Sequence, residues 1–154
     1  MVAFKKENEK PLTPDRGKTI SKRILMVDDS QTIRDMVAAF LVSLGYEVAL
    51  AVNGIEALAV FLHRSFDLVL TDLEMPAMDG YILAGHIKRK SPGTPVILLT
   101  GSDRETVLNK MEAGFMDSVI FKPFMLEDLQ VSVQKALAVE ELKYESIGAP
   151  GDVL

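Results

Sequence analysis

Cysteine and tryptophan are absent from the 154 residues, and histidine occurs only twice. Without cysteine the chain forms neither disulfides nor thiolate metal sites, so any metal must take oxygen or nitrogen ligands. No apolar run approaches the roughly 18 residues that a membrane span needs. Residues 1–10 are not followed by the apolar segment of a signal peptide. We therefore expect a cytoplasmic domain without membrane association.

Positively charged residues are also fewer than negatively charged ones, with 17 Lys and Arg residues against 22 Asp and Glu and a net charge of -5. Nucleic-acid binding needs clustered Lys and Arg, so we expect no nucleic acid as the direct partner of this chain. The basic run 88–90 is interpreted as a solvated helix end, where the helix dipole favours cations. The composition, 48% hydrophobic and 25% charged, is that of an ordinary folded domain.

Composition divides the chain into three segments. Residues 1–21 mix charge with proline and glycine without apolar periodicity, and we expect a mobile N-terminal tail. Residues 22–142 alternate strand-length apolar runs with stretches of helical period, which is typical of βα units around a parallel sheet. Residues 143–154 contain two glycines and a proline and are expected to form a C-terminal tail.

Five βα units fit residues 22–142, which predicts an α/β fold with an open parallel sheet. The strands are expected at 23–27, 46–51, 66–71, 95–100 and 118–121, and the helices at 30–44, 53–64, 80–90, 102–113 and 126–142. Gly45 is expected to end the first helix, and Asn53 and Asp79 to cap the second and third. Ser102 and Glu105 have the spacing of a capping box for the fourth.

Polar side chains follow the strands at one edge of this sheet. Ligands of open parallel sheets bind beyond the carboxyl ends of the strands, and there the sequence places Asp28, Asp29, Asp72, Thr100 and Lys122. Carboxylates about 4 Å apart repel by about 4 kcal/mol at a surface-like dielectric, so the cluster needs a cation to stay ionised. An all-oxygen site without Cys or His suits Mg²⁺.

This combination of groups indicates phosphoryl transfer. A metal beside a phosphoryl group, the Lys122 point charge and the Thr100 hydroxyl form an electrostatic clamp, and one carboxylate is left as nucleophile. Each residue alone has a simpler interpretation. Asp28 and Asp29 fit the first turn of a helix, Asp72 a loop, Thr100 a strand end and Lys122 a solvated loop. Their convergence favours the chemical role.

Five short motifs then resemble the receiver domain of two-component response regulators, the stand-alone chemotaxis type included. They are VDDS at 27–30, NGIEAL at 53–58, DLEMPAMDG at 72–80, LLTG at 98–101 and KPF at 122–124. The resemblance covers about 22–142, and with the five βα units it implies a flavodoxin-like, doubly wound parallel sheet of order 2-1-3-4-5 in a three-layer α/β/α arrangement. It implies a domain that takes a phosphoryl group from a phosphohistidine and switches a protein-interaction surface. Such a domain is not an enzyme in the ordinary sense, since it catalyses only its own phosphorylation and dephosphorylation.

The same resemblance implies the role of each acidic residue. Asp72 would be the phosphoacceptor. Asp29 and Asp72 would ligate Mg²⁺ directly, Asp28 would act through water or behind the direct ligands, and the backbone carbonyl of Glu74 would be the third protein ligand. Thr100 and Lys122 would each bind a phosphoryl oxygen. The bond between Lys122 and the proline after it would be cis, as an X-Pro bond permits.

The sequence departs from the family pattern at several positions. Val119 stands where the family carries a switching aromatic residue, and the run 114–122 is one residue longer than usual, so a simple aromatic switch is not carried over. Gly101 stands where alanine is common. Glu74 and Ser102 occupy positions that tune the rate of dephosphorylation in relatives. The sequence does not show whether they speed or slow this reaction.

The resemblance also implies partners: a sensor histidine kinase or a histidine phosphotransfer protein as donor, and a downstream protein on the face of the fourth helix, fifth strand and fifth helix. A homodimer is left open. The strongest alternative is a Mg²⁺-dependent phosphohydrolase with an Asp nucleophile, since Glu74 follows Asp72 by two residues, although no cap segment is inserted. A flavodoxin-type small-molecule binder is disfavoured because no Ser, Thr and Gly-rich loop follows the first strand.

Two further groups of side chains are assigned from their spacing. His63 and His86 lie in helical stretches and are interpreted as surface residues. Met111, Phe115 and Met116 fit either the core or an exposed, adaptable patch.

Overall fold

The computed structural model describes residues 21–112 and 114–147, with side chains described up to residue 138. Strands and helices alternate along this part of the chain. The strands are β1 (Arg23–Val27), β2 (Glu47–Ala51), β3 (Leu68–Asp72), β4 (Val96–Thr100) and β5 (Ser118–Phe121). The helices are α2 (Gln31–Ser43), α3 (Gly54–His63), α4 (Gly80–Lys90), α5 (Arg104–Met111) and α6 (Leu126–Ile147).

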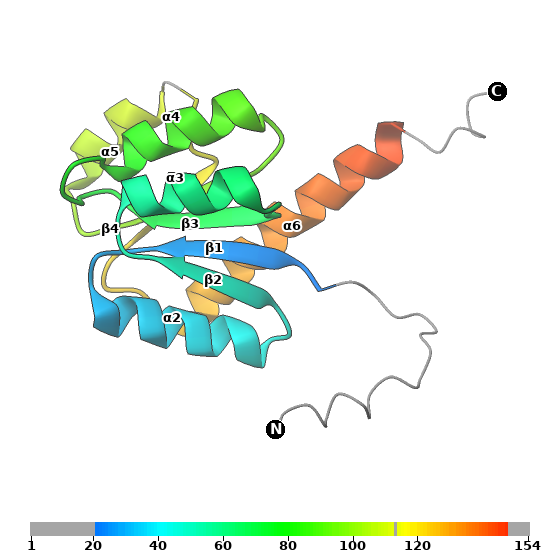
Figure 1. Cartoon of the computed structure of the whole chain (residues 1–154), viewed down its shortest axis with the longest axis horizontal. Coiled ribbons are helices and arrows are strands. Elements are labelled where there is room, and N and C mark those ends of the chain that lie inside the picture. The colour runs from blue at the N-terminus through cyan, green and yellow to red at the C-terminus, as the bar shows by residue number, and fades with distance from the viewer. Residues whose placement is uncertain (1–20, 113, 148–154) are drawn as a thin grey trace.

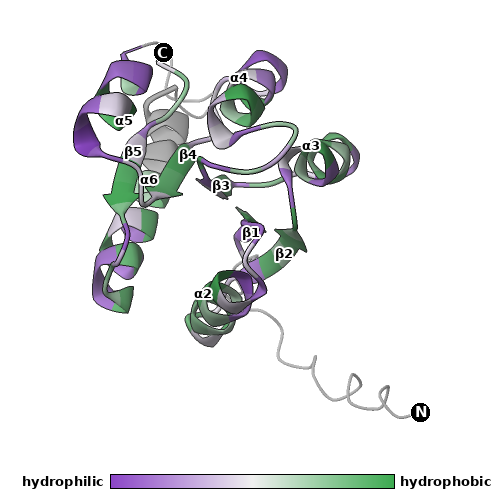
Figure 2. Ribbon diagram, turned by 90° about the vertical axis from the view of Figure 1, so that its left-hand side faces the viewer, coloured by the Kyte–Doolittle hydropathy of each residue, from purple (hydrophilic) through white to green (hydrophobic). Residues whose placement is uncertain are grey.

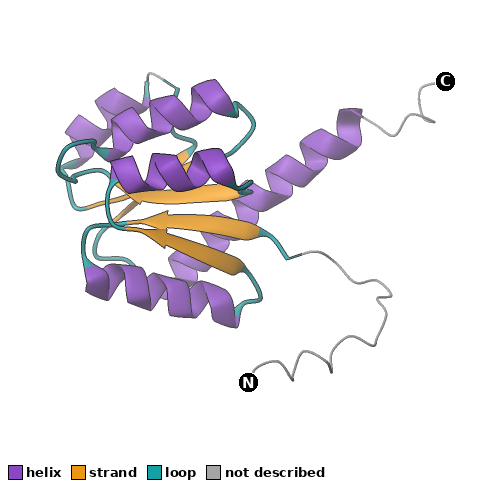
Figure 3. Ribbon diagram, viewed as in Figure 1, coloured by secondary structure: helices purple, strands orange, loops and turns teal. Residues whose placement is uncertain are grey.

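The five strands form one parallel sheet in the order β2-β1-β3-β4-β5, which confirms the predicted topology. Helices α2 and α6 cover one face, and α3, α4 and α5 cover the other (Figures 1 and 3). The chain runs outward from β1 to β2 and then returns past β1 to β3. The strand order therefore reverses between β1 and β3, and ligands of open α/β sheets bind at such a reversal.

The core consists of two apolar layers on either side of the sheet. Because successive strand side chains point to opposite faces, Leu25 and Val27 join the layer under α3, α4 and α5, whereas Ile24 and Met26 join the layer under α2 and α6. All residues of β3 and β4 are buried. In Figure 2 the strands are largely hydrophobic, while the helices carry both hydrophobic and polar residues. The buried sheet gives the strand ends a rigid base.

Polar side chains and a glycine cap the ends of three helices, as expected. The Asn53 side chain accepts a hydrogen bond from the Glu56 backbone N–H at 2.8 Å, and the Asp79 carboxylate accepts one from the Ile82 N–H at 2.9 Å. Gly45 follows α2 with φ +100°, the left-handed conformation that favours glycine after a helix. These devices set where α3 and α4 begin and where α2 ends.

The capping box expected at Ser102 is wrong. Asp103 is the N-cap of α5, and its carboxylate accepts hydrogen bonds from both the backbone N–H and the hydroxyl of Thr106. These bonds lower the pKa of Asp103. A carboxylate is a strong acceptor beside the positive end of a helix, so Asp103 takes the cap and Ser102 donates its hydroxyl to Glu74 instead.

Strands β2, β3 and β4 begin one or two residues later than predicted, and β5 begins as predicted. Asp67 lies just before β3, and its carboxylate accepts the backbone N–H of Arg23, at the start of β1, at 2.8 Å. Asp117 lies just before β5, and its carboxylate accepts the N–H of Val96, the first residue of β4, at 2.8 Å. Each aspartate thus satisfies the first donor of a neighbouring strand.

The last helix is longer than predicted. Helix α6 continues to Ile147, five residues beyond the expected end at 142 and into the segment expected to be a tail. Residues 1–20 and 148–154, the rest of the expected tails, lie outside the described residues. No helix in the described part of the chain is long and apolar enough to cross a membrane.

The apolar residues near α5 belong to the core rather than to an exposed patch. Met116 is buried, and Met111 and Phe115 are half-buried and pack against the core layer. The Phe115 ring lies 5.4 Å from the Tyr81 ring and contacts α4 at Gly85, where an added Cβ would lie 3.3 Å from that ring. These contacts tie the segment after α5 to α4.

The loop between β3 and α4 contains one strained residue. Ala77 has φ +71°, a left-handed conformation that costs an L-residue with a Cβ roughly 1–2 kcal/mol. We expect Ala77→Gly to raise the free energy of unfolding by about 0.5–1 kcal/mol, because glycine adopts this conformation without strain but loses more entropy on folding. Ala39→Gly, at an exposed position of α2, is the control and should lower stability by about 1 kcal/mol. Urea unfolding measures both, and equal destabilisation by the two variants would contradict strain at Ala77.

Candidate functional site

The turn after β1 carries two of the expected carboxylates. Asp28 is fully buried, and its carboxylate oxygen Oδ1 accepts the backbone N–H of Ser30 at 2.9 Å. Ser30 then caps α2 through its hydroxyl, which accepts the N–H of Ile33. Asp29, between them, is exposed and has no hydrogen-bond or ion-pair partner among the described residues. The turn therefore buries one carboxylate and leaves the next free.

Asp72 completes the acidic cluster from the neighbouring strand. It is the last residue of β3 and is 7% exposed. One carboxylate oxygen from each of Asp28, Asp29 and Asp72 lies within 4.8 Å of the others. The three carboxylates that the sequence places after β1 and β3 are thus brought together at the reversal of strand order.

Lys122, directly after β5, supplies a positive charge to the acidic cluster. Its ammonium Nζ lies 3.1 Å from an Asp28 carboxylate oxygen and 3.5 Å from one of Asp72. Its backbone N–H donates to the carbonyl of Thr100 at 2.7 Å, and its bond to Pro123 is cis, as expected. Lys122 therefore bridges two carboxylates that would otherwise repel one another.

One positive charge does not balance three carboxylates. Burial is the main cause that raises the pKa of Asp72 above its ordinary value. The ammonium of Lys122 lowers this pKa, and the carboxylate of Asp28 raises it further. A divalent cation would relieve both the burial and the repulsion. The donor set fits such an ion, because three carboxylates that converge within 4.8 Å, one of them without a partner, are the hard oxygen ligands of Mg²⁺.

Thr100 is the last residue of β4. In the sheet register Asp72 pairs with Leu99, the residue before Thr100. It is fully buried, and its hydroxyl oxygen accepts the backbone N–H of Ser102 at 2.9 Å. The hydroxyl hydrogen remains available for donation. The structure therefore places Thr100 at the same sheet edge as the cluster, bonded to the loop before α5.

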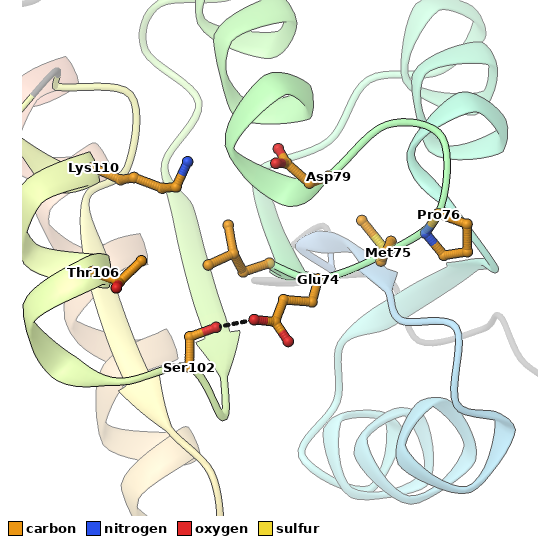
Figure 4. A pocket seen from close by; sticks show the side chains of 8 residues that line it. Glu74, Met75, Pro76, Asp79, Ser102, Thr106 and Lys110 are labelled. Atoms are coloured by element: carbon orange, nitrogen blue, oxygen red, sulfur yellow. Dashed lines mark hydrogen bonds between the residues drawn. The ribbon is translucent and has the colours of Figure 1, made fainter.

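Glu74 and Ser102 connect the two loops beside the cluster. The Ser102 hydroxyl donates to the Glu74 carboxylate at 2.5 Å, and Figure 4 shows the Glu74 side chain directed from the loop after β3 toward Ser102. The bond crosses a pocket of about 490 Å³ between this loop and α5. The pocket is lined by Leu73, Glu74, Met75, Pro76, Asp79, Ser102, Thr106 and Lys110. The sequence placed both residues near the site but gave no sign of the bond.

Other residues singled out in the sequence lie apart from the cluster. Val119 is half-buried against the core, and the aromatic residue of β5 that contacts α5 is Phe121, whose ring lies 4.3 Å from the guanidinium carbon of Arg104. His63 is exposed as expected, and His86 is half-buried. Arg34 contacts the backbone carbonyl of Asp28. It lies in none of the five sequence motifs, so it is not identified from the sequence.

The fold and the site define an open parallel α/β domain with an acidic cluster and a lysine where its strand order reverses. The sequence matches the family model of the response regulator receiver domain over residues 24–134. The chain therefore belongs to the receiver-domain family of response regulators. Receiver domains are the phosphoacceptor switches of two-component signalling, and these matches give no support to the phosphohydrolase alternative.

Curated relatives are longer proteins. The chain is 38% identical over 128 residues to the regulatory protein AtoC of Escherichia coli, an alignment that covers 82% of this chain and 28% of that protein. It is 40% identical over 116 residues to the transcriptional regulatory protein ZraR of Salmonella typhimurium, with 75% of this chain and 26% of that protein covered. The chain thus spans about a quarter of the length of these relatives.

Solved structures share the fold. The chemotaxis protein CheY4 of Vibrio cholerae has a TM-score of 0.73 and 33% identity, over 77% of this chain and 100% of that chain. The response regulator TrrA of Thermotoga maritima, solved in complex with Mg²⁺ and BeF, has a TM-score of 0.70 and 37% identity, over 75% of this chain and 99% of that chain.

The electrostatics of the cluster have a consequence for stability without metal. Because the pKa of Asp72 is raised by folding, its stabilising contribution is complete below the unfolded value, about 3.9, and is lost as pH rises through the folded value. We expect Asp72→Asn, which carries no charge, to gain stability over wild type as pH rises from about 4 to 7.

Urea unfolding in a chelating buffer measures this difference. Asp35→Asn, at an exposed position of α2, is the control for simple loss of a negative charge. A stability gain for Asp72→Asn that is independent of pH, or no larger than that of the control, would contradict the assigned cause.

Proposed function

We propose that this receiver domain accepts a phosphoryl group on Asp72 from a phosphohistidine of a sensor histidine kinase or a histidine phosphotransfer protein. The observation that carries the proposal is the convergence of three carboxylate oxygens within 4.8 Å, one of them from the strand-end Asp72, with Lys122 beside them. Residues 22–142 form the receiver domain in this proposal, and the protein acts in the cytoplasm.

The cluster divides between metal binding and reaction. Asp29, Asp72 and the backbone carbonyl of Glu74 hold Mg²⁺, and Asp28 acts through water or behind the direct ligands. Bound there, Mg²⁺ neutralises charge that develops on the phosphoryl oxygens. The partnerless carboxylate of Asp29 and the raised pKa of Asp72 support this assignment. The complex of TrrA with Mg²⁺ and BeF supports it from a relative.

The transfer itself exchanges one bond to phosphorus for another. A carboxylate oxygen of Asp72 attacks the phosphorus, the O–P bond forms, and the P–N bond to the donor imidazole breaks with its electron pair returning to nitrogen. Lys122 moves its ammonium from Asp28 toward a phosphoryl oxygen, and the Thr100 hydroxyl donates to another. Water later attacks the aspartyl phosphate and releases phosphate, so the domain catalyses its own dephosphorylation.

The output is association with another protein. Thr100 and Lys122 lie at the ends of β4 and β5, so a change in their contacts is transmitted first to α5, β5 and α6. We propose that this face binds the downstream protein, with a homodimer as one form of association. Direct nucleic-acid binding by this chain is not part of the proposal.

Phosphorylation by a small acyl phosphate tests the proposal without a kinase. With Mg²⁺, we expect wild type to gain one phosphoryl group in intact mass, because Asp72 supplies the nucleophile. Asp72→Asn should show no gain, and wild type in a chelator should show none. Asp35→Asn, whose carboxylate lies on the surface of α2, is the matched control and should be modified like wild type. Modification of Asp72→Asn at the wild-type level would contradict the proposal.

The bond between Glu74 and Ser102 sets the lifetime of the aspartyl phosphate. The bond holds the Glu74 carboxylate at the pocket between the loop after β3 and α5. We propose that the carboxylate, held there, limits the access of water to the phosphoryl group. We expect both Ser102→Ala and Glu74→Ala to shorten the lifetime, measured by phosphate release after removal of the donor. Lys110→Met changes the same pocket away from this bond and should leave the lifetime unchanged. Longer lifetimes in both alanine variants would mean that Glu74 orients water instead.

A further inference from the structure

Arg34 contacts the acidic cluster from a helix that contributes none of its carboxylates. The side chain is half-buried in the first part of α2, and its Nη1 donates to the backbone carbonyl oxygen of Asp28 at 2.8 Å. The other polar atoms of Asp28 have separate partners, since its N–H donates to the Ala51 carbonyl and its carboxylate oxygens accept from Ser30 and Lys122. Arg34 thus completes the hydrogen bonding of Asp28.

The carbonyl that Arg34 binds belongs to the peptide that joins Asp28 to Asp29. Because a peptide unit is planar, a hydrogen bond to its oxygen also fixes the direction of the Asp29 N–H and restricts where the Asp29 side chain points. No described hydrogen bond or ion pair holds the Asp29 carboxylate itself. Its direction therefore depends on the backbone that Arg34 holds.

We propose that Arg34 is a positioning residue for the cation site, and that its bond to the Asp28 carbonyl keeps the Asp29 carboxylate facing Asp72. This inference rests on the proposed function, in which Asp29 and Asp72 ligate a divalent cation. A ligand that is oriented before binding loses less conformational entropy when the cation arrives. Arg suits the task because a charged donor makes a strong hydrogen bond to a carbonyl.

The charge of Arg34 and its hydrogen bond act on cation binding in opposite directions. A positive charge beside the cluster repels a cation, so loss of charge alone would tighten Mg²⁺ binding. Loss of the hydrogen bond would loosen the Asp28 to Asp29 peptide and weaken binding. Substitution of Arg34 therefore distinguishes the two roles by the sign of its effect.

The test is the dissociation constant for Mg²⁺, measured on the full chain by amide chemical shifts of Asp29 and Ser30. We expect Arg34→Met to weaken Mg²⁺ binding about tenfold, the lower end of the effect of losing a group that orients a metal ligand. Arg89→Met removes the same charge from an exposed position in the last turn of α4 and should bind Mg²⁺ like wild type. Urea unfolding establishes that each variant is folded under the binding conditions.

Arg34→Lys keeps the charge but replaces the planar fork with a compact ammonium. Weaker Mg²⁺ binding by Arg34→Lys would therefore be due to the changed hydrogen-bond geometry and not to a change in charge. The Arg34→Lys variant also serves as the test if Arg34→Met does not fold. Binding by both variants that equals or exceeds that of wild type would overturn the positioning role and leave the proposed function intact. Failure of wild type to bind Mg²⁺ would overturn the cation site and this inference together.

Discussion

Burial of mutually repelling carboxylates at one edge of the sheet is the constraint on which the site depends. Asp28 and Asp72 are buried, and Asp29 brings a third carboxylate oxygen within 4.8 Å of theirs. The Lys122 ammonium offsets the repulsion from Asp28, yet burial keeps the pKa of Asp72 raised. Any process that adds positive charge stabilises the ionised carboxylates, so the raised pKa of Asp72 and the proposed affinity for Mg²⁺ have the same physical cause.

The fold holds these groups together against their repulsion. Strands β1 and β3 are adjacent because the chain crosses over β1 on its way from β2, and their buried residues fix where Asp28 and Asp72 lie. The turn after β1 is held by Ser30 and Arg34, and Lys122 is held by its backbone bond to Thr100. A rigid sheet with polar bonds at its edge keeps the site ordered before any ligand arrives.

The sequence predicts the parts of this arrangement that depend on periodicity and strand ends. Apolar runs of strand length and stretches of helical period predict the alternation of strands and helices. The family resemblance implies the strand order, and this order brings Asp28, Asp72 and Lys122 together. Choices between neighbouring side chains were not predictable. Ser102 and Asp103 both suit an N-cap, and only the geometry shows that Asp103 takes it while Ser102 bonds to Glu74. The contact of Arg34 with a backbone carbonyl likewise leaves no pattern in the sequence.

The central claim is that the carboxylate of Asp72, and no other, becomes phosphorylated. Borohydride reduces an aspartyl phosphate to homoserine, which marks the modified residue permanently. After treatment with Mg²⁺ and a small acyl phosphate, followed by borohydride, peptide mass spectrometry should find homoserine at position 72 alone. Homoserine at position 28 or 29 in place of 72, or at none of the three in protein shown to bind Mg²⁺, would contradict the account.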